Sequence, residues 1–189
     1  MARSTYLNSE MLTTFPLTKY RNSALQVIGA SLLITLFSQI KVVLPFTPIP
    51  LTFQTLAALF VGASLGSKKG AAAVLLYFAQ VLIGLPVLAG GEIDPLRFFG
   101  PSGGYCLGFL LEAYCIGWFA ERMNGFQPLK LFVGGILACA LQLSLGCFHL
   151  ASFVGWNSIL MIGFFPFVFG EILKVITVCA YLKSRQNLS

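Results

Sequence analysis

Six long apolar runs are the feature that most restricts the folds open to this chain. Charged residues make up only 10% of its 189 residues and hydrophobic residues 57%, whereas a soluble domain carries roughly 25% charged residues. So few charges cannot cover the surface of a water-soluble globule. Because the runs are continuous rather than alternating, they predict membrane-spanning helices and argue against an outer-membrane barrel.

The six runs predict the six helices of one compact bundle. Pro45, Pro48 and Pro50 separate the first run from the second, because proline interrupts a helix. The short connections predict a single all-α transmembrane domain over residues 1–189, with residues 1–19 as a polar cytoplasmic lead-in. A spanning helix needs roughly 20 residues, and the runs cover residues 24–44, 51–66, 70–88, 103–120, 129–154 and 158–182.

Positive charge is distributed unevenly among the connections, and this predicts the orientation. With six spans, one side receives Lys41 and Arg97 and the other side receives eight Lys and Arg residues. The eight are Lys19, Arg21, Lys68, Lys69, Arg122, Lys130, Lys183 and Arg185. Cytoplasmic loops are enriched in Lys and Arg, so both termini are predicted to be cytoplasmic in a multi-pass protein of the cytoplasmic membrane. The apolar runs imply membrane lipid as a partner. The basic residues form no stripe, so nucleic acid is not expected as a partner.

Two charged residues, Glu171 and Lys174, lie well inside the last apolar run. A charge at membrane depth costs about 2.5–3.5 kcal/mol on the mildest scale. Their spacing of three places both on one helix face, where they can neutralise each other. They form either an internal ion pair that locks two helices or a polar recognition site for a solute. Pro166, five residues before Glu171, predicts a kink in this helix.

An outward stretch rich in glycine and proline, residues 84–108, is too apolar for a plain solvated loop. Such a segment favours a lid folded over a site, where backbone groups, including those of Gly90 and Gly91, can contact a ligand. Arg97 can bind a ligand carboxylate in a forked pair, or it can form a salt bridge with an acidic residue of the same stretch.

Three further polar residues leave alternatives open. Tyr105 offers a ligand its ring and hydroxyl group, or it is an aromatic anchor at the membrane interface. Gln54, near the start of the second run, faces the same cavity or bonds to a neighbouring helix. Glu112, in the fourth run, faces the bundle interior or lies in the cytoplasmic half.

Small residues recur at every fourth position in two rows, which indicates close helix contacts. Small side chains let helices approach closely in lipid. The first row is Ala58, Gly62, Gly66 and Gly70, and the second is Gly100, Gly104 and Gly108.

The chain carries no recognisable catalytic or metal-binding motif. Its five cysteines form no CxxC pair, and its single histidine, His149, has no acid or cysteine at ligand spacing. It contains no Ser/His/Asp set with a plausible elbow, no HExxH and no P-loop. We therefore expect no catalytic residues, no metal and no cofactor. An acid–base enzyme using Glu171 and Lys174, and a purely structural subunit, are the alternatives from other classes.

Four segments of the chain resemble the BioY family, the biotin-binding S components of energy-coupling factor (ECF) transporters. They are PFTPIPLTFQTLAAL, YFAQVLIGLPVLAGG, GPSGGYCLGF and GEILK, and the resemblance covers roughly residues 24–182. It implies a six-helix fold that captures biotin from outside with high affinity. An S component for a different vitamin is the alternative within this fold.

The resemblance also implies roles for residues and partners. The family carries an Asp and, three residues later, a Lys that face biotin, and here these are Glu171 and Lys174. Glu171 is expected to accept from the ureido N–H groups and Lys174 to donate to the ureido carbonyl, while Arg97 or lid N–H groups hold the carboxylate. The expected partners are a transmembrane coupling subunit and two ATPase subunits, or a homo-oligomer if the chain acts alone. The usual docking motif on the first helix is Ala-x-x-x-Ala, and here Ser31 and Thr35 are the closest small pair.

Overall fold

A computed structural model describes residues 23–123, 125 and 127–186 of the chain. The predicted cytoplasmic lead-in, residues 1–19, lies outside the described residues. The described part is built almost entirely from helices, with one two-stranded antiparallel hairpin. The α-helices are α1 (Ser23–Ser38), α2 (Gln54–Leu65), α3 (Ser67–Leu82), α4 (Gly103–Glu121), α5 (Pro128–Val154) and α6 (Phe165–Gln186). Strands β1 (Lys41–Val42) and β2 (Leu51–Thr52), a 3-10 turn η2 (Arg97–Phe99) and a π-helical segment η3 (Leu160–Phe164) complete the order.

The expected runs match α4 and α5 to within a residue and differ from the other helices. α2 begins at Gln54 rather than at residue 51, because residues 51–52 form β2, and α6 begins at Phe165 rather than at residue 158, after η3. α1 ends at Ser38 rather than at residue 44, because the chain turns into β1. α3 ends at Leu82 rather than at residue 88, and Gly84 follows with a φ of 80°. Within the described residues, two helical segments are long and apolar enough to cross a membrane, Pro128–Val154 and Leu160–Ser184. α1 and α2 are shorter apolar helices.

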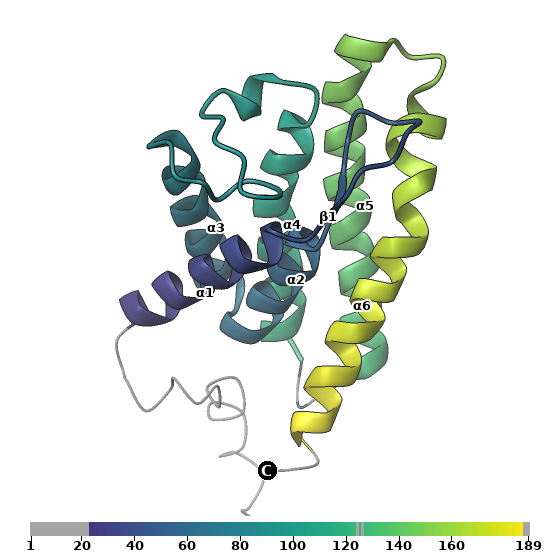
Figure 1. Cartoon of the computed structure of the whole chain (residues 1–189). Coiled ribbons are helices and arrows are strands. Elements are labelled where there is room, and N and C mark those ends of the chain that lie inside the picture. Colours follow the sequence, from purple (N-terminus) through teal and green to yellow (C-terminus); the bar gives the residue numbers. More distant parts are fainter. Residues whose placement is uncertain (1–22, 124, 126, 187–189) are drawn as a thin grey trace, which may run out of the picture.

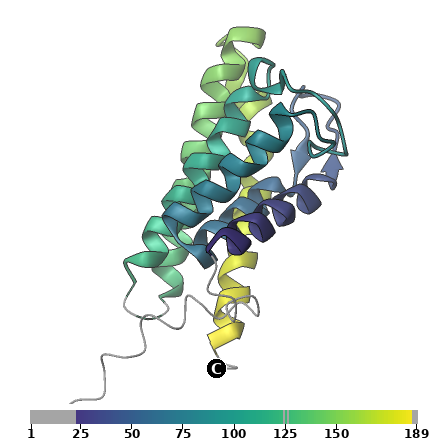
Figure 2. The same ribbon diagram turned by 90° about the vertical axis from the view of Figure 1, so that its left-hand side faces the viewer.

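The helices form a bundle in which α5 and α6 are the long members and α1 lies obliquely across α2 and α3 (Figures 1 and 2). We call residues 83–102, between α3 and α4, the lid, and residues 41–52 the hairpin. The lid, the hairpin and the connection from α5 to η3 lie toward one end of the bundle, and α6 runs toward the other end (Figure 1). Of these segments, the hairpin and the lid contribute residues to the lining of a pocket.

Most members of the two rows of small residues lie at close helix contacts, whereas Gly66 and Gly100 lie outside the helices. A Cβ atom at Gly108 in α4 would lie 2.8 Å from Cγ of Gln142 in α5, and one at Gly70 in α3 would lie 2.9 Å from Cα of Gly62 in α2. Gly66 has a φ of 84° and forms the turn between α2 and α3. These contacts leave no room for larger side chains at the centre of the bundle.

The docking pair expected on α1 faces inward. Ser31 is fully buried, and its Oγ accepts from Nε2 of Gln80 in α3 at 3.0 Å. Thr35 Oγ1 donates to Oε1 of the same Gln80 at 3.1 Å. Ser31 and Thr35, the small pair closest to the usual docking motif, therefore bond to α3. The exposed face of α1 carries large apolar side chains instead, namely Leu25, Ile28, Leu32 and Leu36.

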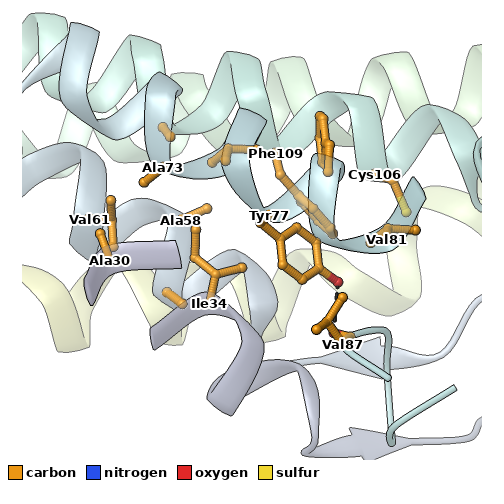
Figure 3. Close-up of a cluster of buried hydrophobic side chains, with 14 of the residues drawn as sticks. Ala30, Ile34, Ala58, Val61, Ala73, Tyr77, Val81, Val87, Cys106 and Phe109 are labelled. Carbon is orange, nitrogen blue, oxygen red and sulfur yellow. Dashed lines mark hydrogen bonds between the residues drawn. The ribbon is translucent and has the colours of Figure 1, made fainter. Parts of the chain in front are cut away.

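One cluster of buried side chains reaches from the helices up to the lid (Figure 3). Tyr77 of α3 stands at its edge, and its hydroxyl group donates to the carbonyl oxygen of Val87 at 3.0 Å. Ser38 Oγ donates to the same carbonyl oxygen at 2.6 Å. The first part of the lid is therefore anchored to the core by side chains of α1 and α3.

Candidate ligand-binding pocket

A pocket lies at the lid end of the bundle, where side chains from the hairpin, α2, the lid, α4, α5 and α6 meet. About 540 Å³ of space not filled by protein atoms lies within it, a volume that includes open solvent at its mouth. Aromatic and aliphatic side chains form much of the wall. The polar lining side chains are those of Thr52, Gln54, Thr55, Arg97, Ser102, Tyr105, Gln142, Glu171 and Lys174.

Glu171 and Lys174 of α6 form a buried ion pair in the pocket lining. Lys174 Nζ lies 2.8 Å from Glu171 Oε1, and the two residues are 6% and 5% exposed. Lys174 also donates to the carbonyl oxygen of Thr52 at 2.8 Å and to Oγ1 of Thr55 at 2.6 Å. Thr55 Oγ1 in turn donates to Glu171 Oε1 at 3.1 Å. An ammonium group has three N–H donors, so each donor of Lys174 has a partner.

Thr52 and Thr55 were not singled out from the sequence, although both contact the ion pair. A hydroxyl group in an apolar helix is common, and nothing in its type reveals its partner. The available signal was the polar TFQT segment (52–55) at the edge of an apolar run. The predicted pair on one face of the last helix is confirmed as a buried contact, and it links α6 to the start of α2.

Glu112 of α4 faces the bundle interior, which decides between the two alternatives. Its side chain is fully buried. Cys139 Sγ lies 3.6 Å from Glu112 Oε1 and 3.8 Å from Glu171 Oε2. Glu112 Oε2 has no hydrogen-bond partner among the described residues. The oxygen and sulfur atoms of these three residues lie within 4.8 Å of one another, as in a metal site. However, the Lys174 ammonium already neutralises Glu171, which disfavours a further cation.

Tyr105 is a pocket residue rather than an interfacial anchor. It is only 5% exposed, and its hydroxyl group donates to the carbonyl oxygen of Gly163 in η3 at 2.8 Å. Pro166 follows this π-helical segment at the start of α6, where the kink was predicted.

Both alternatives hold for Gln54, which faces the cavity and also bonds to a neighbouring helix. It lines the pocket, yet its Nε2 donates to Tyr77 Oη at 2.6 Å and its Oε1 accepts from Thr52 Oγ1 at 3.2 Å.

Arg97 lines the pocket and also forms the salt bridge that was its alternative. Its guanidinium group pairs with Glu92 Oε2, and Lys41 of the hairpin pairs with Glu92 Oε1 at 2.5 Å. The hydrogen bond from Lys41 and the charge of Arg97 hold the pKa of Glu92 below its ordinary value. One carboxylate therefore joins the hairpin to the lid. The lid also carries Asp94, so Lys41 and Arg97 are balanced by two acidic residues at this end.

Gly90 and Gly91 lie in the lid near the pocket, but the described lining contains their neighbours Leu88 and Ala89 instead. Both glycines have positive φ angles, 72° and 78°, which favour glycine because other residues are strained there. The N–H of Gly90 donates to the carbonyl oxygen of Ser38 at 3.0 Å. These two residues therefore shape and anchor the lid.

Comparison with known proteins supports one family. The family model described as the BioY family matches residues 9–188. The biotin transporter BioY2 of Lactococcus lactis subsp. cremoris (strain MG1363) is 34% identical over 166 residues, which cover 87% of this chain and 89% of that protein. The biotin transporter BioY of Thermotoga maritima (strain MSB8) is 32% identical over 134 residues, covering 70% of this chain and 78% of that protein.

The fold has a counterpart among solved structures. The crystal structure of the S-component for biotin from an ECF-type ABC transporter superposes with a TM-score of 0.80, at 23% identity, over 87% of this chain and 90% of that chain. The six-helix architecture expected from the sequence is thereby confirmed. The match along nearly the whole length, together with the identity to its relatives, shows that this chain belongs to the BioY family.

Proposed function

We propose that this chain binds biotin in the pocket at the lid end and takes it up across the membrane as the substrate-binding S component of an ECF-type transporter. Its family relatives are biotin transporters, so the chain is a transport protein rather than an enzyme. The observation that carries the pocket assignment is the buried Glu171–Lys174 pair, which lines the pocket together with other polar side chains.

The ion pair suits the ureido ring of biotin, which has a carbonyl group between two N–H groups. Lys174 would donate to the ureido carbonyl in place of one of its present partners. Glu171 would accept from a ureido N–H group, and hydrogen bonds to charged groups are stronger than neutral ones. The apolar fused ring would lie against Tyr105 and Phe167, whose ring centroids are 6.0 Å apart.

Arg97 suits the carboxylate at the other end of biotin. A guanidinium group has five N–H donors, and its pairing with Glu92 leaves several for a ligand. Because Arg97 lines the pocket and Glu92 does not, the guanidinium group of Arg97 is the cation that would attract the anion there.

The orientation and the partners complete the proposal. The lid end faces outward and both termini face the cytoplasm, because the Lys and Arg residues concentrate in the opposite connections. A transmembrane coupling subunit and two ATPase subunits supply the energy. The apolar exposed face of α1, rather than Ser31 and Thr35, is the surface available to lipid or to the coupling subunit.

Calorimetric titration of the detergent-purified chain with biotin tests the ligand and the site together. We expect Lys174→Met and Glu171→Gln each to weaken binding by roughly 10- to 100-fold, the value of a hydrogen bond to a charged group. Lys183→Met is the matched control, because Lys183 is exposed on the same helix, and it should bind as the native chain does. Thermal unfolding verifies that each variant is folded.

The outcomes separate the ligand from the site. If the folded native chain does not bind biotin, biotin is the wrong ligand and a panel of other vitamins follows. If the native chain binds and both α6 variants bind equally well, the ligand is right and the pocket assignment is wrong.

A further inference from the structure

Gln142 of α5 was not singled out by the sequence, yet it lines the pocket and is 2% exposed. Its Oε1 has no hydrogen-bond partner among the described residues. A buried acceptor without a partner is unfavourable, so native proteins rarely leave one unless a ligand or water supplies the donor. Ser102 Oγ, also in the lining, lacks a described partner as well, but a hydroxyl group can rotate toward a new one.

The amide orientation of Gln142 follows from its contacts. Nε2 lies 3.5 Å from the carbonyl oxygen of Tyr105, one turn before Gly108 in α4. Exchanging the nitrogen and oxygen atoms would bring two acceptors together. The side chain packs over Gly108, where an added Cβ would lie 2.8 Å from Gln142 Cγ. The packing and the Nε2 contact together leave Oε1 as the acceptor that is available to a ligand.

Glu112 Oε2 also lacks a described partner, but Glu112 is not part of the pocket lining. The lining acceptors on Glu171 and Gln54 are largely occupied. Glu171 Oε1 receives Lys174 and Thr55, and Glu171 Oε2 lies beside the Cys139 thiol. Gln54 Oε1 receives the Thr52 hydroxyl group. Glu171 therefore has room for one ligand N–H at Oε2, whereas a ureido ring presents two.

We propose that Gln142 is a specificity-determining residue for the ureido ring: its Oε1 accepts one ureido N–H while Glu171 accepts the other. This inference rests on the proposed function. It makes the pocket selective for a ring with a donor on each side of its carbonyl group, because an analogue that lacks the donor facing Gln142 leaves Oε1 unpaired.

The test uses biotin and its two cyclic-carbamate analogues, each with one ureido N–H replaced by a ring oxygen. On the native chain, each analogue should bind about tenfold more weakly than biotin, the effect of one lost hydrogen bond. In Gln142→Met, which keeps the size but removes the acceptor, biotin should lose about tenfold, and one of the analogues should bind as tightly as biotin. The second analogue, which lacks the donor to Glu171, should stay weaker than biotin.

A merely structural role of Gln142 would weaken all three ligands alike, and that result overturns the inference. Gln80→Met is the comparison variant, since Gln80 lies outside the pocket lining and its amide bonds to Ser31 and Thr35 of α1, and it should keep the order of the three ligands. If Gln142→Met does not fold, the native chain alone still decides, because an analogue that binds as tightly as biotin shows that one N–H has no acceptor. If the native chain binds no biotin, the proposed function itself fails.

Discussion

The three ionisable side chains buried in or beside the pocket are not equivalent. Glu171 and Lys174 neutralise each other at 2.8 Å, and two threonines complete their hydrogen bonds. Glu112 has only the Cys139 thiol as a described partner, at 3.6 Å. Burying a charge without a partner is costly. Glu112 is therefore the least compensated polar group of the site.

This difference predicts that Glu112→Gln is tolerated. Glutamine has the same shape without the charge, so we expect thermal unfolding to occur at the same temperature or a few degrees higher, with biotin affinity within about threefold of the native value, inside the spread of a neutral change. Glu171→Gln should instead weaken binding strongly. A large loss of affinity in Glu112→Gln would contradict this view, because it would show that the site needs the second carboxylate.

At the residue scale, sequence reasoning found the charged members of the site and two uncharged ones, Gln54 and Tyr105, but missed Thr52, Thr55 and Gln142. Glu171 and Lys174 were conspicuous because charge is rare inside an apolar run. Thr55 and Gln142 were not, since uncharged polar residues occur in many membrane helices and their partners are set by tertiary packing. Gly90 and Gly91 were named for their backbone freedom, which serves the turns of the lid.

At the scale of elements, the contact between α4 and α5 supports the pocket wall. Gly108 lies against both the backbone and the side chain of Gln142, with an added Cβ 3.0 Å from Gln142 Cα. We expect Gly108→Ala to lower the unfolding temperature and to weaken ligand binding, because α5 must move away. Gly170→Ala in α6 is the matched control, since its Cβ would meet only Leu51 Cδ1, at 3.5 Å. A Gly108→Ala chain as stable as the control would show that α5 can shift freely.

The Glu92 network between the hairpin and the lid should give a pH-dependent contribution to stability. Because the pKa of Glu92 is lowered in the folded state, its contribution is present above the ordinary value of 4.5 and is lost as the pH falls through the lower folded value. The unfolding temperature of the native chain should therefore exceed that of Glu92→Gln slightly at neutral pH, and the difference should vanish in acid. The effect is small because the pair is partly exposed. A difference that grows in acid would contradict this sign.

Element boundaries were predictable where the chain carries a strong stop signal. α5 begins at Pro128 and is followed by Gly155, and both ends lie within a residue of the prediction. The hairpin was not predictable, because strands of two residues show no alternation. Residues 39–44, which contain β1, continue the apolar run of the first helix, so they were expected to be helical.

At the scale of the whole molecule, the irregular segments lie at one end of the bundle and most of the Lys and Arg residues lie at the other. The lid, the hairpin and the connection between α5 and η3 share one end (Figure 1), and the lid end carries Lys41 and Arg97, both paired with Glu92. The connections at the other end carry most of the Lys and Arg residues. The pocket is therefore built from the segments with the least positive charge, which agrees with a binding site on the outward side.

Reporter fusions in bacterial cells test this orientation. Because positively charged connections remain in the cytoplasm, we expect a green fluorescent protein fused after residue 189 to fluoresce and an alkaline phosphatase fused there to be inactive. Alkaline phosphatase inserted in the lid, between Glu92 and Asp94, should be active, since that enzyme needs the disulfides that form outside the cytoplasm. The reverse pattern would place the pocket mouth in the cytoplasm, and capture of biotin from outside would then be impossible for this chain in its resting state.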